Sequence, residues 1–221
     1  MQRTICLVYC GGAGGNHVAN MISLCRDMAP RFQSPNYQEE MLQKYKNFNY
    51  LRPCHKGIMA HFYTNGLTYD GSNVHNTDIL MDDEYRAEFL SRKHSSVLNG
   101  HEFNWDALYC TFPDINLVNP LWVIFTVPSP ESRPGKRIRL HEWWPKKPDR
   151  YKFPFAPGTR SEYVAHDGIV LDTELLFTES GSQYVRELLQ PYDIELPIEA
   201  DIAHKEWYKW MVYVTENKWD Q

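Results

Sequence analysis

No lysine occurs in the sequence before Lys44, and this absence limits what the glycine-rich first segment can bind. The phosphate-binding loop of ATP-hydrolysing proteins ends in Gly-Lys-Ser/Thr, where the lysine reaches the phosphates and the hydroxyl binds Mg²⁺. Gly15, Asn16 and His17 stand at the corresponding place in this sequence. The side chains that ATP hydrolysis needs at this loop are therefore missing.

Long apolar runs, paired cysteines and excess positive charge are also missing. No hydrophobic run approaches the roughly 20 residues of a membrane-spanning helix, and no signal peptide precedes the first expected strand. The five cysteines and the scattered histidines lack the spacing of a disulfide framework or a zinc site. A net charge of −5 argues against a general nucleic-acid binder. We expect a cytoplasmic protein with no metal, no nucleic-acid partner and no membrane span.

Positive charge is nevertheless concentrated in one segment. Between residues 129 and 152 arginines and lysines clearly outnumber acidic residues. A local basic segment in an acidic chain favours one small polyanionic ligand. Because prolines and charges dominate residues 129–157, we predict an irregular insertion or lid there. The pair Trp143-Trp144 beside it would stack an adenine, cover a substrate or simply anchor the loop.

Strands and helices are predicted to alternate along a single domain of residues 1–221, which indicates an α/β fold. Residues 5–9 form a continuous apolar run, typical of a strand buried on both faces of a parallel sheet. Other strands are expected at residues 57–62, 95–101 and 121–127 and from residue 169. Helices are expected at residues 18–25, 37–48, 82–93 and 183–189 and from Pro197 onward, with Trp207 on the buried face of the last one.

The turn between the first strand and the first helix is the most informative segment. Four of its five residues, Gly11 to Gly15, are glycines. Glycines allow backbone N–H groups to converge on phosphate oxygens, and a helix N-terminus attracts anions. A merely tight turn is the alternative, and it would not need four glycines. The dinucleotide fingerprint fits poorly, because His17 occupies the position of its third glycine.

This segment, continuing through Asn16 and His17 to Asn20, resembles the first loop of sulfotransferase-like P-loop proteins, particularly divergent members from bacteria and marine viruses. Residues 97–101, 170–176 and 197–217 resemble later segments of the same family. The resemblance implies a three-layer P-loop NTPase-like fold with a mostly parallel central sheet. It also implies that the chain binds the sulfate donor PAPS and that the reaction converts PAPS to PAP. A viral member of the family would act inside a bacterial host.

The resemblance assigns roles to particular residues. His101, at the end of a strand, would be the catalytic base; a partly buried histidine bonded to the neighbouring backbone is the alternative. His17 would replace the usual lysine as a donor to phosphate and would be a second catalytic residue, although a capping or solvent-facing role remains open. The loop and the segment after the middle strand would bind the nucleotide through Gly11, Gly12, Ala13, Gly14, Gly15, Asn16, His17, Ser129, Ser132 and Arg133.

Three functions follow as hypotheses. The first is sulfuryl transfer from PAPS to a hydroxyl acceptor, which could be a sugar, a phenol or a lipid headgroup. The second is a nucleotide- or phosphate-binding module without catalysis, which the missing lysine favours. The third is a phosphotransferase with an unusual loop. The sequence indicates neither the acceptor nor the oligomeric state.

Overall fold

The computed structural model describes residues 3–9, 13–25, 67–69, 72–74, 87, 95–101, 117, 119–129, 131–140 and 168–216. The predicted helix at residues 37–48 and the predicted strand at residues 57–62 lie outside these ranges, as does all of the predicted helix at residues 82–93 except Ala87. The same holds for Gly11 and Gly12, and for residues 141–157.

A four-stranded parallel sheet forms the centre of the described structure, in the order β4-β1-β5-β6. Its strands are β1 (Thr4–Tyr9), β4 (Ser96–His101), β5 (Leu121–Phe125) and β6 (Ile169–Leu171). All six residues of β1 are buried, and β1 has a neighbouring strand on each side. The prediction of an α/β protein with a mostly parallel sheet is confirmed at this level.

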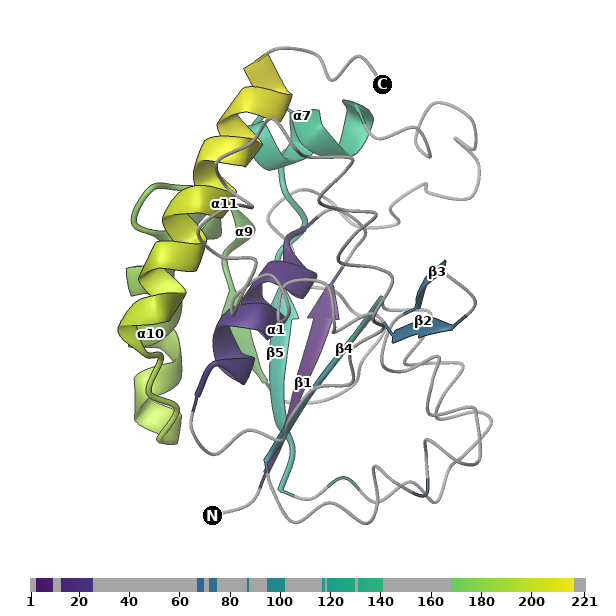
Figure 1. Cartoon of the computed structure of the whole chain (residues 1–221), viewed down its shortest axis with the longest axis vertical. Coiled ribbons are helices and arrows are strands. Elements are labelled where there is room, and N and C mark those ends of the chain that lie inside the picture. The colour runs from purple at the N-terminus through teal and green to yellow at the C-terminus, as the bar shows by residue number, and fades with distance from the viewer. Residues whose placement is uncertain are drawn as a thin grey trace.

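Helices follow the strands. They are α1 (Gly15–Ser23), α7 (Arg133–Leu140), α9 (Thr173–Leu176), α10 (Gly181–Leu189), the 3₁₀ turn η1 (Gln190–Tyr192) and α11 (Ile198–Glu216). Helix α11 runs along one side of the molecule, beside α10 at one end and α7 at the other (Figure 1). A separate antiparallel hairpin joins β2 (Leu67–Tyr69) to β3 (Ser72–Val74).

The hydrophobic core joins the sheet to α1, α10 and α11. Val18, Met21 and Ile22 of α1 are fully buried, and α11 contributes Trp207 and Met211. The predicted core position of Trp207 is confirmed, since only 1% of its surface is exposed. The 3₁₀ turn η1 that follows α10 ends at Asp193, which adopts a left-handed conformation that aspartate tolerates (φ 60°) and lets the chain turn toward α11.

The strand order gives the sheet a topological switch point between β1 and β5. The chain leaving β1 continues to β4 on one side, whereas the chain leaving β5 continues to β6 on the other. In open α/β sheets ligands bind where the connections diverge in this way, beyond the carboxyl ends of the strands. The arrowheads of β1 and β5 both point toward the end of the molecule where α7 lies (Figure 1). The β1–α1 turn, the end of β4 and the start of α7 all belong to the carboxyl edge of the sheet.

One predicted element is wrong. Residues 133–140 form helix α7, where an irregular segment was expected. The prolines and charges of residues 129–157 led to that expectation, but Pro134 lies in the first turn of α7, where proline is tolerated because its missing N–H would have no partner in the helix. The hydroxyl of Ser132 accepts a hydrogen bond from the Gly135 N–H (3.3 Å) and so caps the helix.

Candidate functional site

The β1–α1 turn requires glycine at two described positions, for different reasons. Gly14 is the N-cap of α1 and has φ 85°, a left-handed conformation that most side chains avoid. Gly15 has an ordinary φ, but a Cβ there would lie 2.1 Å from the Tyr9 ring. Tyr9 is itself buried and donates a hydrogen bond from its hydroxyl to Asn16 Oδ1 (2.8 Å). Tyr9 therefore packs against Gly15 and is hydrogen-bonded to Asn16, so it holds the turn in place.

Within the described ranges, the start of α1 lacks both a capping side chain and an acidic residue in its own first turn. The first bond of the helical ladder runs from Val18 N–H to the Gly14 carbonyl (3.1 Å). The N-terminal end of a helix dipole is thus directed to the carboxyl edge of the sheet, an arrangement that stabilises a negative charge.

His17 lies in the interior and not on the surface of the turn. Its side chain is 1% exposed and stacks on Trp207, with ring centroids 4.1 Å apart and an interplanar angle of 4°. Its Nε2 is 3.0 Å from Nδ1 of His204 on α11. The solvent-facing role left open for His17 is wrong. The roles of donor to phosphate and of catalytic residue stay predictions.

His204 is the partner that links α11 to the turn. It is fully buried, and its Nε2 is 2.8 Å from the carbonyl oxygen of Thr178. Burial lowers the pKa of His204, while the Thr178 carbonyl and the negative charge of Asp201 act in the opposite direction. Gly181 allows this packing, since a Cβ there would lie 2.7 Å from the His204 ring.

His101 is the last residue of β4 and pairs in register with Tyr9, the last residue of β1. The strand predicted to end in this histidine is confirmed. Its backbone therefore lies at the carboxyl edge, one strand away from the glycine turn. This neighbourhood joins two candidates that are far apart in the sequence. The orientation of the His101 side chain lies outside the described structure, so its role as a base stays a prediction.

The three candidates after β5 lie at the N-terminal end of α7. The Ser129 N–H donates to a Glu174 carboxylate oxygen (2.7 Å), and the Ser129 hydroxyl donates to Glu131 (2.9 Å). Arg133 donates to the Tyr208 hydroxyl (2.8 Å) and lies over its ring. A phosphate bound here would compete with these two carboxylates and would have to draw Arg133 away from α11. Binding of a 3′-phosphate by these residues stays a prediction.

The cap of α7 gives a first test of this part of the structure. Ser132→Ala should lower the free energy of unfolding by about 1 kcal/mol, because the Gly135 N–H loses its acceptor. Urea denaturation measures the loss. Ser129→Ala is the matched control and should change stability by less than about 0.5 kcal/mol, since the bond from its hydroxyl is exposed. Equal losses in the two variants would contradict the assignment of Ser132 as the cap.

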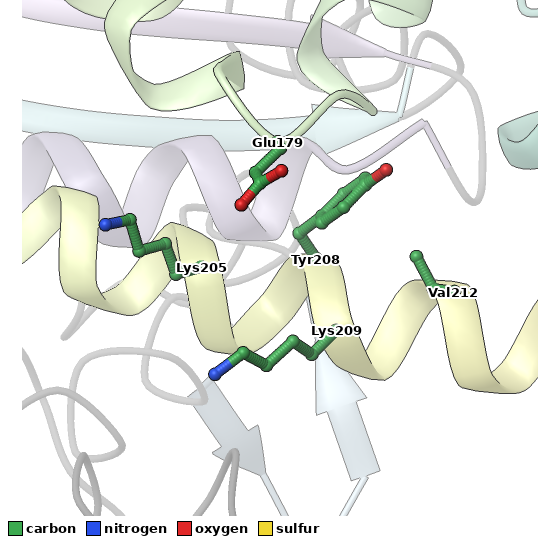
Figure 2. Close-up of a pocket in the computed structure, with 5 residues that line it drawn as sticks. All are labelled: Glu179, Lys205, Tyr208, Lys209 and Val212. Atoms are coloured by element: carbon green, nitrogen blue, oxygen red, sulfur yellow. The ribbon is translucent and has the colours of Figure 1, made fainter.

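A shallow groove lies on the outer side of α11 (Figure 2). It has a volume of about 340 Å³ and is lined by Glu179, Lys205, Tyr208, Lys209 and Val212. Lys209 is bonded to Glu206 (2.8 Å), and this contact raises the pKa of Lys209. Tyr208, which lines the groove, also accepts the hydrogen bond from Arg133. Of the described residues that the sequence predicted to bind the nucleotide, none lines the groove.

Two residues of the site were not identified from sequence. Tyr9 was interpreted only as part of a buried strand, and His204 only as part of the last helix. His204 precedes Trp207 by three positions, which places it on the buried face of α11. That spacing could have identified it as an interior residue. No sequence pattern, however, could have paired it with His17.

No family model, curated protein or solved structure matches the chain. Among the residues that the structure describes, no three metal-binding side chains lie close enough together to hold an ion. No helix in the described ranges is long and apolar enough to span a membrane. The arrangement at the carboxyl edge must therefore be interpreted from its own geometry.

Proposed function

We propose that the chain is a sulfotransferase-like P-loop protein that binds PAPS at the β1–α1 turn and transfers its sulfuryl group to a hydroxyl acceptor. The proposal depends chiefly on one observation, the left-handed Gly14 at the start of α1, directly beyond the central parallel strand. Backbone N–H groups at a helix N-terminus in that position suit the phosphosulfate of PAPS. The topological switch point between β1 and β5 is where open α/β sheets bind ligands, so the nucleotide would extend over the adjoining strand ends.

In the proposed reaction the acceptor oxygen attacks the sulfur of PAPS. A new S–O bond to the acceptor forms while the bond from sulfur to the bridging oxygen breaks, and PAP leaves with that oxygen. His101, at the end of β4, takes the acceptor's proton as the general base. The N-terminus of α1 stabilises the negative charge that develops on the bridging oxygen.

A second candidate is binding without catalysis, and the burial of His17 favours it. Residues 13–16 carry no positive side chain, and the histidine that follows them is turned toward α11. Transfer enzymes place cations or strong donors where charge develops in the transition state. If the backbone alone holds the anion, the chain would recognise a nucleotide or phosphate and serve as an interaction module.

Thermal-shift measurements with PAP, ATP, NAD and sulfate test the proposal. A ligand that binds only the native state stabilises it by about 2.7 kcal/mol at a hundred times its Kd, and PAP should raise Tm most. The absence of any shift with millimolar PAP or PAPS would refute binding. Release of PAP from PAPS in the presence of sugars, phenols or lipid headgroups then separates a transferase from a binding module.

A pair of glycine variants assigns the binding to the turn. Gly14→Ala should weaken PAP binding by up to about 5–30-fold and so reduce the PAP-induced shift, because the left-handed conformation is strained by about 1–2 kcal/mol for other residues. Gly168→Ala controls for lost stability. Its Cβ would lie 2.8 Å from the Trp122 carbonyl at the opposite edge of the sheet, so it also destabilises but should retain the shift. Equal loss of binding in both variants would contradict the assignment.

A further inference from the structure

The buried contact between His17 and His204 connects the start of α1 to a helix at the other end of the chain. His17 is the third residue of α1, and His204 lies on the buried face of α11. The two rings are joined by a 3.0 Å hydrogen bond, and His204 is joined in turn to the Thr178 carbonyl. A continuous chain of hydrogen bonds thus runs from the α9–α10 connection through α11 to the first turn of α1.

The donor and acceptor capacities of the groups determine which nitrogen carries the hydrogen in each of these hydrogen bonds. A carbonyl oxygen only accepts, so Nε2 of His204 must carry the hydrogen that bonds Thr178. In neutral His204, Nδ1 is then an acceptor, and Nε2 of His17 must donate to it. If His204 gained a second proton, its Nδ1–H would face the Nε2–H of His17. Two donors in contact repel each other, so the bond between the helices would be lost unless His17 moved its own hydrogen from Nε2 to Nδ1 and accepted at Nε2 instead.

We propose that His204 is a positioning residue for the glycine-rich turn, and that it holds the first turn of α1 in its anion-binding arrangement only while it is neutral. The inference rests on the proposed function in so far as the turn binds an anion. Its structural part, the neutral hydrogen-bonded pair, concerns the protein alone. Trp207 assists by stacking on His17, which leaves the imidazole little freedom to turn.

The surroundings of His204 favour the neutral form. Burial lowers the pKa of its imidazole, and the negative charge of Asp201 offsets this only in part. Asp201 is itself bound to Arg186 of α10 (2.7 Å). The titratable or charged groups around His204 come from α1, from the α9–α10 connection, from α10 and from α11 itself. Among the residues that the structure describes, they are His17, Glu179, Arg186, Asp201, Lys205 and Tyr208.

The sign of the pH effect follows from this lowered pKa. The unfolded chain takes up a proton at His204 near its usual pKa, whereas the folded chain takes it up only at a lower pH. The contribution of the neutral pair is therefore complete above the usual pKa of histidine. It is lost progressively as the pH falls below that value toward the pKa of the folded state.

Sulfate is a suitable probe, because it does not change charge between about pH 7.5 and 5.5, the range in which histidine titrates. Its affinity for the wild type should fall with decreasing pH, by up to about tenfold per pH unit below the pKa of His204, since one proton must leave for each anion bound. General electrostatics predicts the opposite, because a chain that gains positive charge attracts anions more strongly. Constant or stronger binding at low pH would overturn the proposal.

Two variants isolate the residue. His204→Gln can still accept a hydrogen bond but cannot be protonated, so its sulfate affinity should not fall at low pH. Lys205→Gln is the matched control, because it changes the adjacent, exposed position of the same helix and should keep the wild-type fall. A parallel fall in His204→Gln would show that another group titrates and would overturn the proposal.

A measurement without ligand separates this inference from the proposed function. Long-range ¹H–¹⁵N spectra of the wild type should show the Nε2–H form for both histidines at neutral pH. Hydrogen exchange should show that α1 loses protection, relative to intrinsic rates, when His204 is protonated. An Nδ1–H form of His204, or α1 protection that survives its protonation, would overturn the inference. If neither sulfate nor PAP binds at any pH, the proposed function fails, and these spectra still decide the role of His204.

Discussion

Trp207→Ala is expected to lower the free energy of unfolding by about 3–5 kcal/mol, the range for removing a large buried aromatic side chain. Trp207 is 1% exposed, stacks on His17 and meets Phe177 edge-on with ring centroids 4.8 Å apart. It also packs against the glycine-rich turn, since a Cβ at Gly14 would be 3.5 Å from the Trp207 ring. The substitution therefore removes contacts to α1, to the α9–α10 connection and to the turn at once.

Urea denaturation followed by circular dichroism measures this loss. Trp207→Phe keeps one aromatic ring against His17 and should retain part of the stability. Tyr213→Ala, at a position of the same helix that is 49% exposed, should change stability by less than about 0.5 kcal/mol. A loss below about 1 kcal/mol in Trp207→Ala would show that α11 packs less closely on α1 than described here.

His101→Ala is expected to reduce the rate of sulfuryl transfer by about 10²–10⁴-fold, the usual contribution of a general base. Affinity for PAP should stay the same, because PAP contains no acceptor hydroxyl for the base to contact. The measurement requires PAP release from PAPS with an acceptor found in the substrate panel, alongside the PAP-induced thermal shift. Weakened PAP binding, or a large fall in Tm without ligand, would mean that His101 supports the fold and is not the base.

Much of the fold could be predicted because the signals were local. The apolar run at residues 5–9 indicated a strand covered on both faces, and all six residues of β1 are buried. The strands β4 and β5 pair with β1 on its two sides. The expected strand at residues 121–127 forms β5, although β5 ends at Phe125 and Thr126 continues with a single bond to Leu171. The expected helix at residues 183–189 forms α10, which begins two residues earlier. Such boundaries depend on caps and pairing more than on hydrophobic period.

The error at α7 has a physical cause. Residues 133–140 carry little apolar signal, because arginine and lysine occupy four of the eight positions of the helix. Its start depends on the Ser132 hydroxyl and on a proline in the first turn. Arg133 adds a contact that only tertiary structure provides, since the Tyr208 hydroxyl that it binds is 75 residues away.

The glycine-rich turn illustrates the division between sequence and tertiary structure. Its place between a buried strand and an amphipathic helix is encoded locally, by the spacing of apolar residues and by the left-handed conformation that glycine permits. The burial of the His17 side chain depends on distant residues, because its partner His204 is 187 residues away and the Trp207 ring on which it stacks belongs to the same helix as His204. A local sequence pattern indicates which residues lie on the same face of a helix, but not which other element of the fold packs against that face. Only the packing of α11 on α1 turned that histidine into the interior.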